Sequence, residues 1–177
     1  TTLLGSATAD SNGAFSITPL SALSDGSYFL TATATDAVGN VSSASDSLSI
    51  TIDATAPKAP LIVSSSITND STPTITGSAE ANSTVKLYNG TTLLGSATAD
   101  SNGAFSITSS TLANGNYSLT ATATDAAGNV SFTSDSLSIT IDATAPDAPT
   151  SLTTAATTTD DSTPTITGSA EANSTVK

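Results

Sequence analysis

An internal repeat constrains this chain more than any other feature of its sequence. The segment TTLLGSATADSNGAFSIT at Thr1–Thr18 returns unchanged at Thr91–Thr108, and SDSLSITIDATAP at Ser45–Pro57 returns at Ser134–Pro146. The period of about 90 residues is too long for one coil of a solenoid and matches the size of a small independent domain. The chain must therefore fold as tandem copies of one small unit rather than as a single large globule.

The phase of the repeat divides the chain into three parts. Residues 1–53 correspond to the C-terminal part of one unit, residues 54–142 to a complete unit, and residues 143–177 to the N-terminal part of a further unit. The boundaries lie in DATAPKAP (Asp53–Pro60) and DATAPDAP (Asp142–Pro149), where two prolines three residues apart favour extended backbone. We therefore expect short, fairly rigid linkers between the units.

The pattern within each unit is that of an all-β domain. Short Thr-, Val- and Ile-rich segments alternate with period two, Asn, Asp and Gly separate them, and no helical period occurs. We predict an immunoglobulin-like β-sandwich of about seven strands per repeat, without the Cys and Trp that pin antibody domains. The expected strands of the complete unit are Leu61–Val63, Thr74–Ala79, Thr84–Tyr88, Thr91–Thr98, Ala104–Thr108, Tyr117–Thr124 and Val130–Ile141.

The last two expected strands carry further signals. Tyr117 follows a turn at the start of its strand, where such sandwiches place a corner tyrosine that bonds the backbone upstream. In the final strand, Val130 and Phe132 have the opposite parity to the later apolar residues. We predict a bulge or strand switch across Thr133–Ser136 that keeps both apolar sets buried.

Acidic residues fall at one end of the predicted sandwich. Because antiparallel neighbours alternate in direction, the turns that contain Glu80, Asp100 and Asp125 share a pole, and the incoming linker brings Asp53 to it. Several carboxylates in one place repel each other unless a cation lies among them. Hard oxygen donors without His or Cys favour calcium, so the sequence predicts a Ca²⁺ site at this pole.

Turn formation is the alternative explanation for the same acids. Asp, Asn and Gly are common in turns, and Asx side chains bond their own backbone without any metal. This alternative weighs most for Asp100, whereas Glu80 is open to both interpretations. Calcium binding is the favoured interpretation for Asp53 and Asp125.

Composition argues against several classes of function. The net charge is −12 with three cationic residues, which cannot neutralise a phosphate backbone, so we expect no nucleic-acid partner. No apolar run approaches the length of a membrane span, so we expect no membrane insertion. The chain has no Cys and no His, and acids such as Asp160 and Asp161 lie in a polar segment with nothing to raise a pKa. We therefore expect no enzyme activity.

Three segments together resemble a known family. STPTITGSAEANSTVKLY, GSYFLTATATDAVGNVS and SLSITIDATAPDAP are similar to the bacterial Ig-like tandem repeats of large surface adhesins and biofilm-associated proteins, and the resemblance covers the whole chain. It implies an extracellular stalk of β-sandwiches at the bacterial cell surface, often with Ca²⁺ at the domain junctions. By motif, it assigns a metal-binding role to the aspartates of the TATATD segments, Asp36 and Asp125, and to the linker aspartates, Asp53 and Asp142.

The resemblance makes a structural spacer the leading hypothesis, with neighbouring repeats of the same chain as partners. The alternative is a self-assembling extracellular filament or matrix subunit, joined head-to-tail by strand complementation between incomplete units. In that alternative, Asp147–Lys177 of one molecule completes Thr1–Ile52 of the next. A carbohydrate-binding module ranks lower, because the chain has no Trp and only three tyrosines to stack on a sugar.

Overall fold

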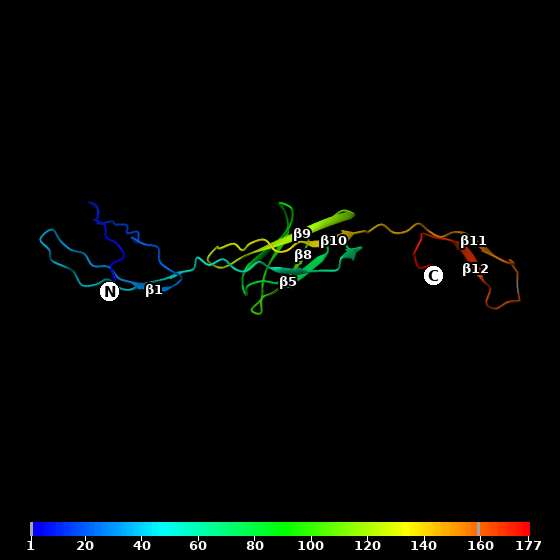
Figure 1. Ribbon diagram of the computed structural model, residues 1–177, viewed down its shortest axis with the longest axis horizontal. Helices are drawn as coiled ribbons and strands as arrows, with labels where there is room; N and C mark the ends of the chain where they lie inside the picture. The colour runs from blue at the N-terminus through cyan, green and yellow to red at the C-terminus, as the bar shows by residue number, and fades with distance from the viewer. Residues whose placement is uncertain (1, 159) are drawn as a thin grey trace.

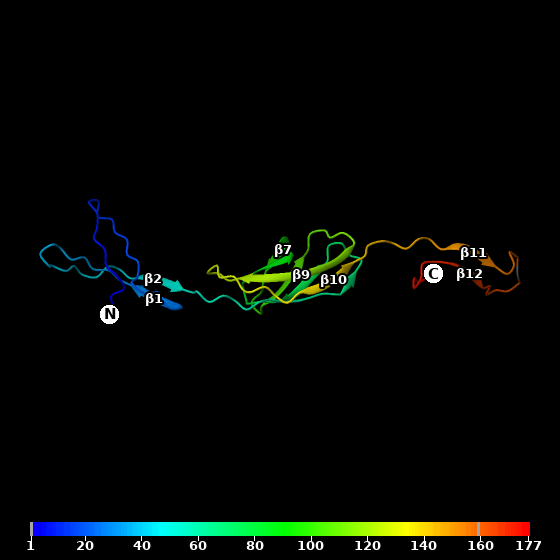
Figure 2. The same cartoon turned by 45° about the horizontal axis from the view of Figure 1, so that its top comes forward.

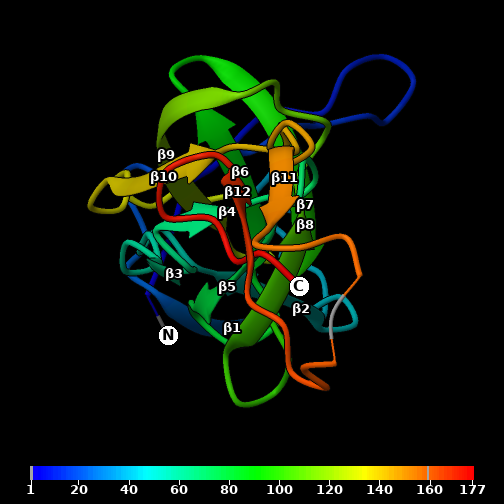
Figure 3. The ribbon, with the colours of Figure 1, turned by 90° about the vertical axis from the view of Figure 1, so that its right-hand side faces the viewer.

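The computed structural model describes residues 2–158 and 160–177, which form strands and no helix. Three parts follow one another along the longest axis of the molecule (Figure 1). The first holds the antiparallel pair β1 (Gly26–Leu30) and β2 (Leu48–Ile52), and the last holds the antiparallel pair β11 (Thr150–Thr154) and β12 (Ile166–Ser169). In Figure 3, which looks along that axis, these parts overlap the central one.

The central part is a sandwich of two sheets. One sheet has the strand order β4-β10-β9-β6-β7 and the other has the order β3-β5-β8. Their strands are β3 (Leu61–Val63), β4 (Ile67–Thr68), β5 (Thr74–Ser78), β6 (Thr84–Asn89), β7 (Thr92–Thr98), β8 (Ala104–Thr108), β9 (Gly115–Thr124) and β10 (Leu137–Ile141). The predicted all-β sandwich is therefore confirmed, and most expected strands begin and end within two residues of the observed ones.

Period-two alternation explains which residues face the core. The inner faces of the two sheets contribute side chains that are nearly or wholly buried, while their Ser and Thr neighbours point outward. On β9 the two last inward positions are Ala121 and Ala123, both fully buried, so the core thins toward that end. The largest buried side chains of the core are Ile75, Leu87, Ile107, Leu119, Ile139 and Ile141.

A short strand that the sequence did not predict lies between the first two expected strands. β3 pairs antiparallel with β5, and the chain then crosses to the other sheet, where β4 pairs in parallel with β10. The N–H groups of Thr140 and Asp142 donate to the carbonyls of Ser66 and Thr68, both at 2.9 Å. Sequence reasoning missed β4 because two residues are too few to show any alternation.

The final strand departs from its prediction. β10 begins only at Leu137, and Val130 and Phe132 are 56% and 91% exposed, so the expectation that both apolar sets are buried was wrong. Ser131 and Ser134 take the inward positions instead. Their hydroxyl oxygens accept the N–H groups of Ala123 and Ala121 at 2.9 Å, where a regular ladder would use backbone carbonyls.

The serine hydroxyls explain how the inward-facing positions can change parity between Ser131 and Leu137 while the backbone groups stay hydrogen-bonded. The N–H groups of Ser131 and Ser134 donate in return to the carbonyls of Ala123 and Ala121, at 2.8 Å each. A serine side chain thus widens the ladder by inserting its hydroxyl between two backbones. The first unit repeats the device, because Ser42 and Ser45 accept from Ala34 and Ala32 at 2.9 and 3.0 Å.

The predicted corner tyrosine is confirmed. The hydroxyl of Tyr117 donates to the carbonyl of Ala113 at 3.0 Å, and Tyr28 in the first unit donates to the carbonyl of Ser24 at 2.8 Å. The bond fixes the turn that leads into β9. The loop Asp125–Asn129 follows directly at the other end of that strand.

No helix that would cross a membrane occurs in the described part of the chain.

Candidate functional site: the interdomain junction

The loop after β9, Asp125–Asn129, is closed by its own aspartate. Asp125 Oδ1 accepts the backbone N–H of Asn129 at 2.9 Å, and Oδ2 accepts the side-chain amide of Asn129 at 2.8 Å. Gly128 has φ of 94°, a left-handed conformation that favours glycine. The first unit repeats this loop with Asp36 and Asn40, so the aspartate after the Thr-Ala run is a built-in turn former.

Hydrogen bonds keep these turn carboxylates ionised. The side-chain amide of Asn129 lowers the pKa of Asp125 below its ordinary value, with smaller help from backbone N–H groups and against the effect of desolvation. The amide of Asn40 lowers the pKa of Asp36 in the same way. Both groups are therefore anionic at neutral pH and present negative charge at the loop after the Thr-Ala run in each unit.

The loop reaches back to the preceding linker. Asn129 Nδ2, which donates to Asp125, also donates to the backbone carbonyl of Asp53 at 3.0 Å. A single amide thus brings the linker aspartate and the loop aspartate to the same end of the sandwich. Figure 2 shows β9 running toward the end of the central part where the incoming linker arrives.

The preceding unit holds the same linker from its other side. Asp25, in the turn before β1, accepts the N–H of Ala54 at 2.8 Å and the hydroxyl of Thr55 at 2.5 Å. The hydroxyl of Thr55 is the main cause of a lowered pKa at Asp25. We call Asp25, Asp53–Thr55, Asp125 and Asn129 the junction. Its linker residues are bonded by both flanking units.

An uncharged residue replaces Asp25 at the next linker. Asn114 precedes β9 as Asp25 precedes β1, and its Oδ1 accepts the N–H of Ala143 at 3.0 Å. Its Nδ2 donates to Thr144 Oγ1 at 2.5 Å and lies 3.5 Å from Asp142 Oδ1. The same contact is therefore made with a carboxylate at one linker and with an amide at the other.

The incoming linker also packs against the central sandwich. Pro57 and Pro60 are buried, whereas Pro146 and Pro149 of the outgoing linker are exposed. Proline fixes its own φ and restricts the residue before it, so burial of both rings adds stiffness to the segment that Asn129 anchors.

Two other predicted metal ligands, Glu80 and Asp100, lie near this end but serve their own turns. Thr84 pairs with both Thr98 and Thr124, which places the turns at Glu80, Asp100 and Asp125 at the same end of the sheet. Asp100 Oδ1 accepts the N–H groups of Asn102 and Ala104, and the Glu80 carbonyl accepts from Ser83. Asp142 lies at the opposite end, after β10. Within residues 2–158 and 160–177, no three His, Cys, Asp or Glu side chains are grouped closely enough to hold a metal ion.

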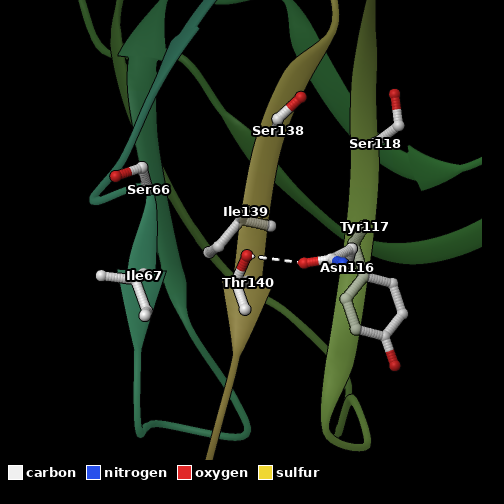
Figure 4. Close-up of a pocket in the computed structure, with 8 residues that line it drawn as sticks. All are labelled: Ser66, Ile67, Asn116, Tyr117, Ser118, Ser138, Ile139 and Thr140. Carbon is white, nitrogen blue, oxygen red and sulfur yellow. Dashed lines mark hydrogen bonds between the residues drawn. The ribbon is translucent and has the colours of Figure 1, made fainter.

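A shallow concave region, separate from the junction, lies on the outer face of the larger sheet (Figure 4). Hydroxyl and amide side chains of β9 and β10 line it beside Ser66 and Ile67, and the Thr140 hydroxyl donates to Asn116 Oδ1 at 2.7 Å. Apart from the phenol of Tyr117, no lining residue is ionisable. This open surface offers hydrogen bonding but no acid–base pair.

Sequence reasoning found Asp53 and Asp125 and missed their partners in the junction. Asp25, Thr55 and Asn114 were not among the predicted site residues, and their bonds span about 30 residues of sequence. The one available signal was that Asp25–Gly26 and Asn114–Gly115 occupy equivalent places before a repeated strand.

Comparison with known proteins gives a family and solved structures that are similar to this chain. A family model described as a bacterial Ig-like domain matches residues 1–54 and 63–143, more than half of the chain. A solved structure named "Biofilm associated protein - BSP domain" is 28% identical, with a TM-score of 0.41; the match covers 81% of this chain and 23% of that one. Comparison with curated proteins finds no match. The chain therefore belongs to the bacterial Ig-like domain family.

Proposed function

We propose that this chain is a spacer from the extracellular stalk of a bacterial surface adhesin, with a mechanical rather than a catalytic role. The observation that carries the proposal is the double anchoring of the linker, by Asp25 of one unit and Asn129 of the next. A linker bonded from both sides transmits the orientation of one sandwich to the next. Tandem units with such linkers project whatever they carry away from a surface.

Loss of the Asn129 side chain tests this function. In Asn129→Ala, the linker loses its anchor to the central sandwich, so small-angle scattering should show a shorter maximum dimension and a broader distance distribution than the wild-type chain. Asn40→Ala is the matched control, because Asn40 makes the same bonds within its loop and no described bond to a linker. If the two variants scatter alike, the junction does not stiffen the chain and the spacer proposal loses its support.

We also propose that Ca²⁺ binds at the junction, with Asp53 and Asp125 as its carboxylate ligands. Asn129 bonds both the Asp125 carboxylate and the Asp53 backbone carbonyl, and the ligand atoms available there are oxygens, which suit a hard cation. Since no third acid side chain among the described residues joins these two aspartates, backbone carbonyls and water would complete the coordination. Asp36 and Asp142 are the equivalents of this pair in neighbouring repeats, whereas Glu80 and Asp100 would contribute charge from nearby turns.

Metal removal tests the calcium proposal. EDTA is expected to lower the melting temperature of the chain and to increase its flexibility in small-angle scattering, because the ion binds only the folded junction. Asp125→Ala should weaken Ca²⁺ binding in calorimetry more than Asp135→Ala, which removes an exposed aspartate outside the junction. Unchanged melting and scattering in EDTA, or equal calcium affinities in the two variants, would contradict the proposal.

Head-to-tail strand complementation between incomplete units stays a prediction, since nothing in residues 2–158 and 160–177 favours it over the spacer.

A further inference from the structure

Strand β7 ends the larger sheet with one side unpaired. It follows β6 at the end of the strand order, and its sequence, TLLGSAT, has no charge and no proline. Ser96 and Thr98 are exposed. Natural sheets usually protect an edge of this length with charges, prolines or bulges, because its free backbone groups can pair with another strand.

The hydrogen-bond pattern shows which residues present these free groups. Ala99 N–H donates to the Ser83 carbonyl at 3.0 Å, on the β6 side of the strand. Because bonding sides alternate along an antiparallel strand, Ala97 also faces β6, whereas Ser96 and Thr98 face away. Within the described residues, the backbone N–H and C=O groups of Ser96 and Thr98 accept and donate no backbone hydrogen bond outside the β6 ladder.

The rest of the edge is already occupied or irregular. The Leu94 carbonyl accepts the N–H of Ser110 at 2.8 Å, and the register with β6 shifts at Leu87 and Tyr88. The segment open to a partner is therefore Ser96–Thr98. The outermost strands on the other side, β3 and β4, have three and two residues and offer less backbone to a partner.

We propose that Ser96–Thr98 pairs antiparallel with the same segment of a second copy of this chain. A two-fold axis at Ala97 sets Ser96 of each copy opposite Thr98 of the other, where both pairs exchange N–H···O=C bonds, about four in all. The hydroxyl side chains of Ser96 and Thr98 then form cross-strand pairs, which are favourable on a sheet surface. An identical partner fits because both sequences are uncharged and small at the contact.

This contact joins one stalk to another, a role that rests on the proposed stalk function. Because the pairing is two-fold symmetric, each stalk contributes the same three residues, and the twist of the combined sheet sets the angle at which the two stalks cross. The segment TTLLGSAT occurs at Thr1–Thr8 and again at Thr91–Thr98, so weak contacts can act together along two stalks.

The test uses the whole 177-residue chain in sedimentation velocity over a range of concentrations and salt. Dimer should increase with concentration and also with salt, because salt screens the repulsion between two chains of net charge −12. Ser96→Pro removes an outward N–H that β6 does not use, and should weaken dimerisation about tenfold while the melting temperature changes little. Ser96→Ala keeps the backbone donor and should dimerise nearly as the wild type does.

Amide exchange gives a result that needs no variant to fold. Protection of the Ser96 and Thr98 amides should rise with protein concentration in the wild-type chain, while that of the Ser138 amide on β10, away from this edge, stays constant. A monomer at every concentration and salt, or constant exchange at Ser96 and Thr98, overturns the pairing. Neither result bears on the stiffness of the junction, which the scattering of Asn129→Ala measures independently.

Discussion

Replacing Gly77 by alanine is expected to destabilise the central sandwich by about 2–3 kcal/mol, the range of an overpacked core. Gly77 on β5 lies between Ile62 and Phe105 in the register. A Cβ atom there would lie 2.0 Å from the Leu61 carbonyl oxygen and 2.7 Å from Phe105 Cζ. The first contact is with backbone, so the strand pair itself must separate before the methyl group fits.

Chemical denaturation of the full chain measures this effect, and the third unit supplies its control. Gly168 occupies the same TITGSAE sequence, but an added Cβ there would meet the end of the flexible Leu152 side chain at 2.7 Å and the Thr150 carbonyl oxygen at 3.0 Å. Gly168→Ala should leave the unfolding of the central sandwich unchanged. A Gly77→Ala chain as stable as the wild type would show that β3 and β5 are not held at this separation.

Replacing Ser134 by alanine is expected to cost about 1–3 kcal/mol, the penalty for a buried donor left without an acceptor. The Ala121 backbone is fully buried, and its N–H donates to Ser134 Oγ at 2.9 Å. Alanine cannot accept this bond, and the widened ladder keeps the backbone of residue 134 from replacing it. Ser131→Ala should act similarly through Ala123, and the double variant should show the sum of both losses or more.

Hydrogen exchange identifies the cause of this loss. In Ser134→Ala, the Ala121 amide should exchange faster. Ser138→Ala, which changes an exposed serine on β10, should change neither exchange nor the free energy of unfolding. If the Ala121 amide stays as protected as in the wild type, another group accepts its bond and the ladder does not depend on the serine hydroxyl.

The two tests bear on a fold that was largely predictable from local pattern. β8 was predicted with its exact bounds because Phe105 and Ile107 alternate with small polar residues between clear turns. Tyr117 was assigned to a corner because it follows a turn at the start of a strand, and its bond to Ala113 spans four residues. Such features depend on neighbours in sequence, which a single sequence displays.

The prediction failed where a side chain replaced the backbone. Val130 and Phe132 were expected to be buried because apolar residues usually are, yet two serines occupy the inner positions beside them. A hydroxyl can complete a ladder only when the facing strand lies at a suitable distance, and that distance depends on residues in β9. Parity along one strand contains no information about this separation.

The sequence by itself determined the repeat, the all-β architecture, the positions of most strands and the presence of an aspartate at each linker and after each Thr-Ala run. These follow from periodicity and turn chemistry, which act over a few residues. Only the tertiary structure decided that Asn129 joins Asp125 to Asp53, that Asp25 holds the same linker from the preceding unit, and that Ser96 and Thr98 are left at an open edge. Those outcomes depend on which strands become neighbours, and that is set by the packing of the two sheets over one core rather than by any local pattern.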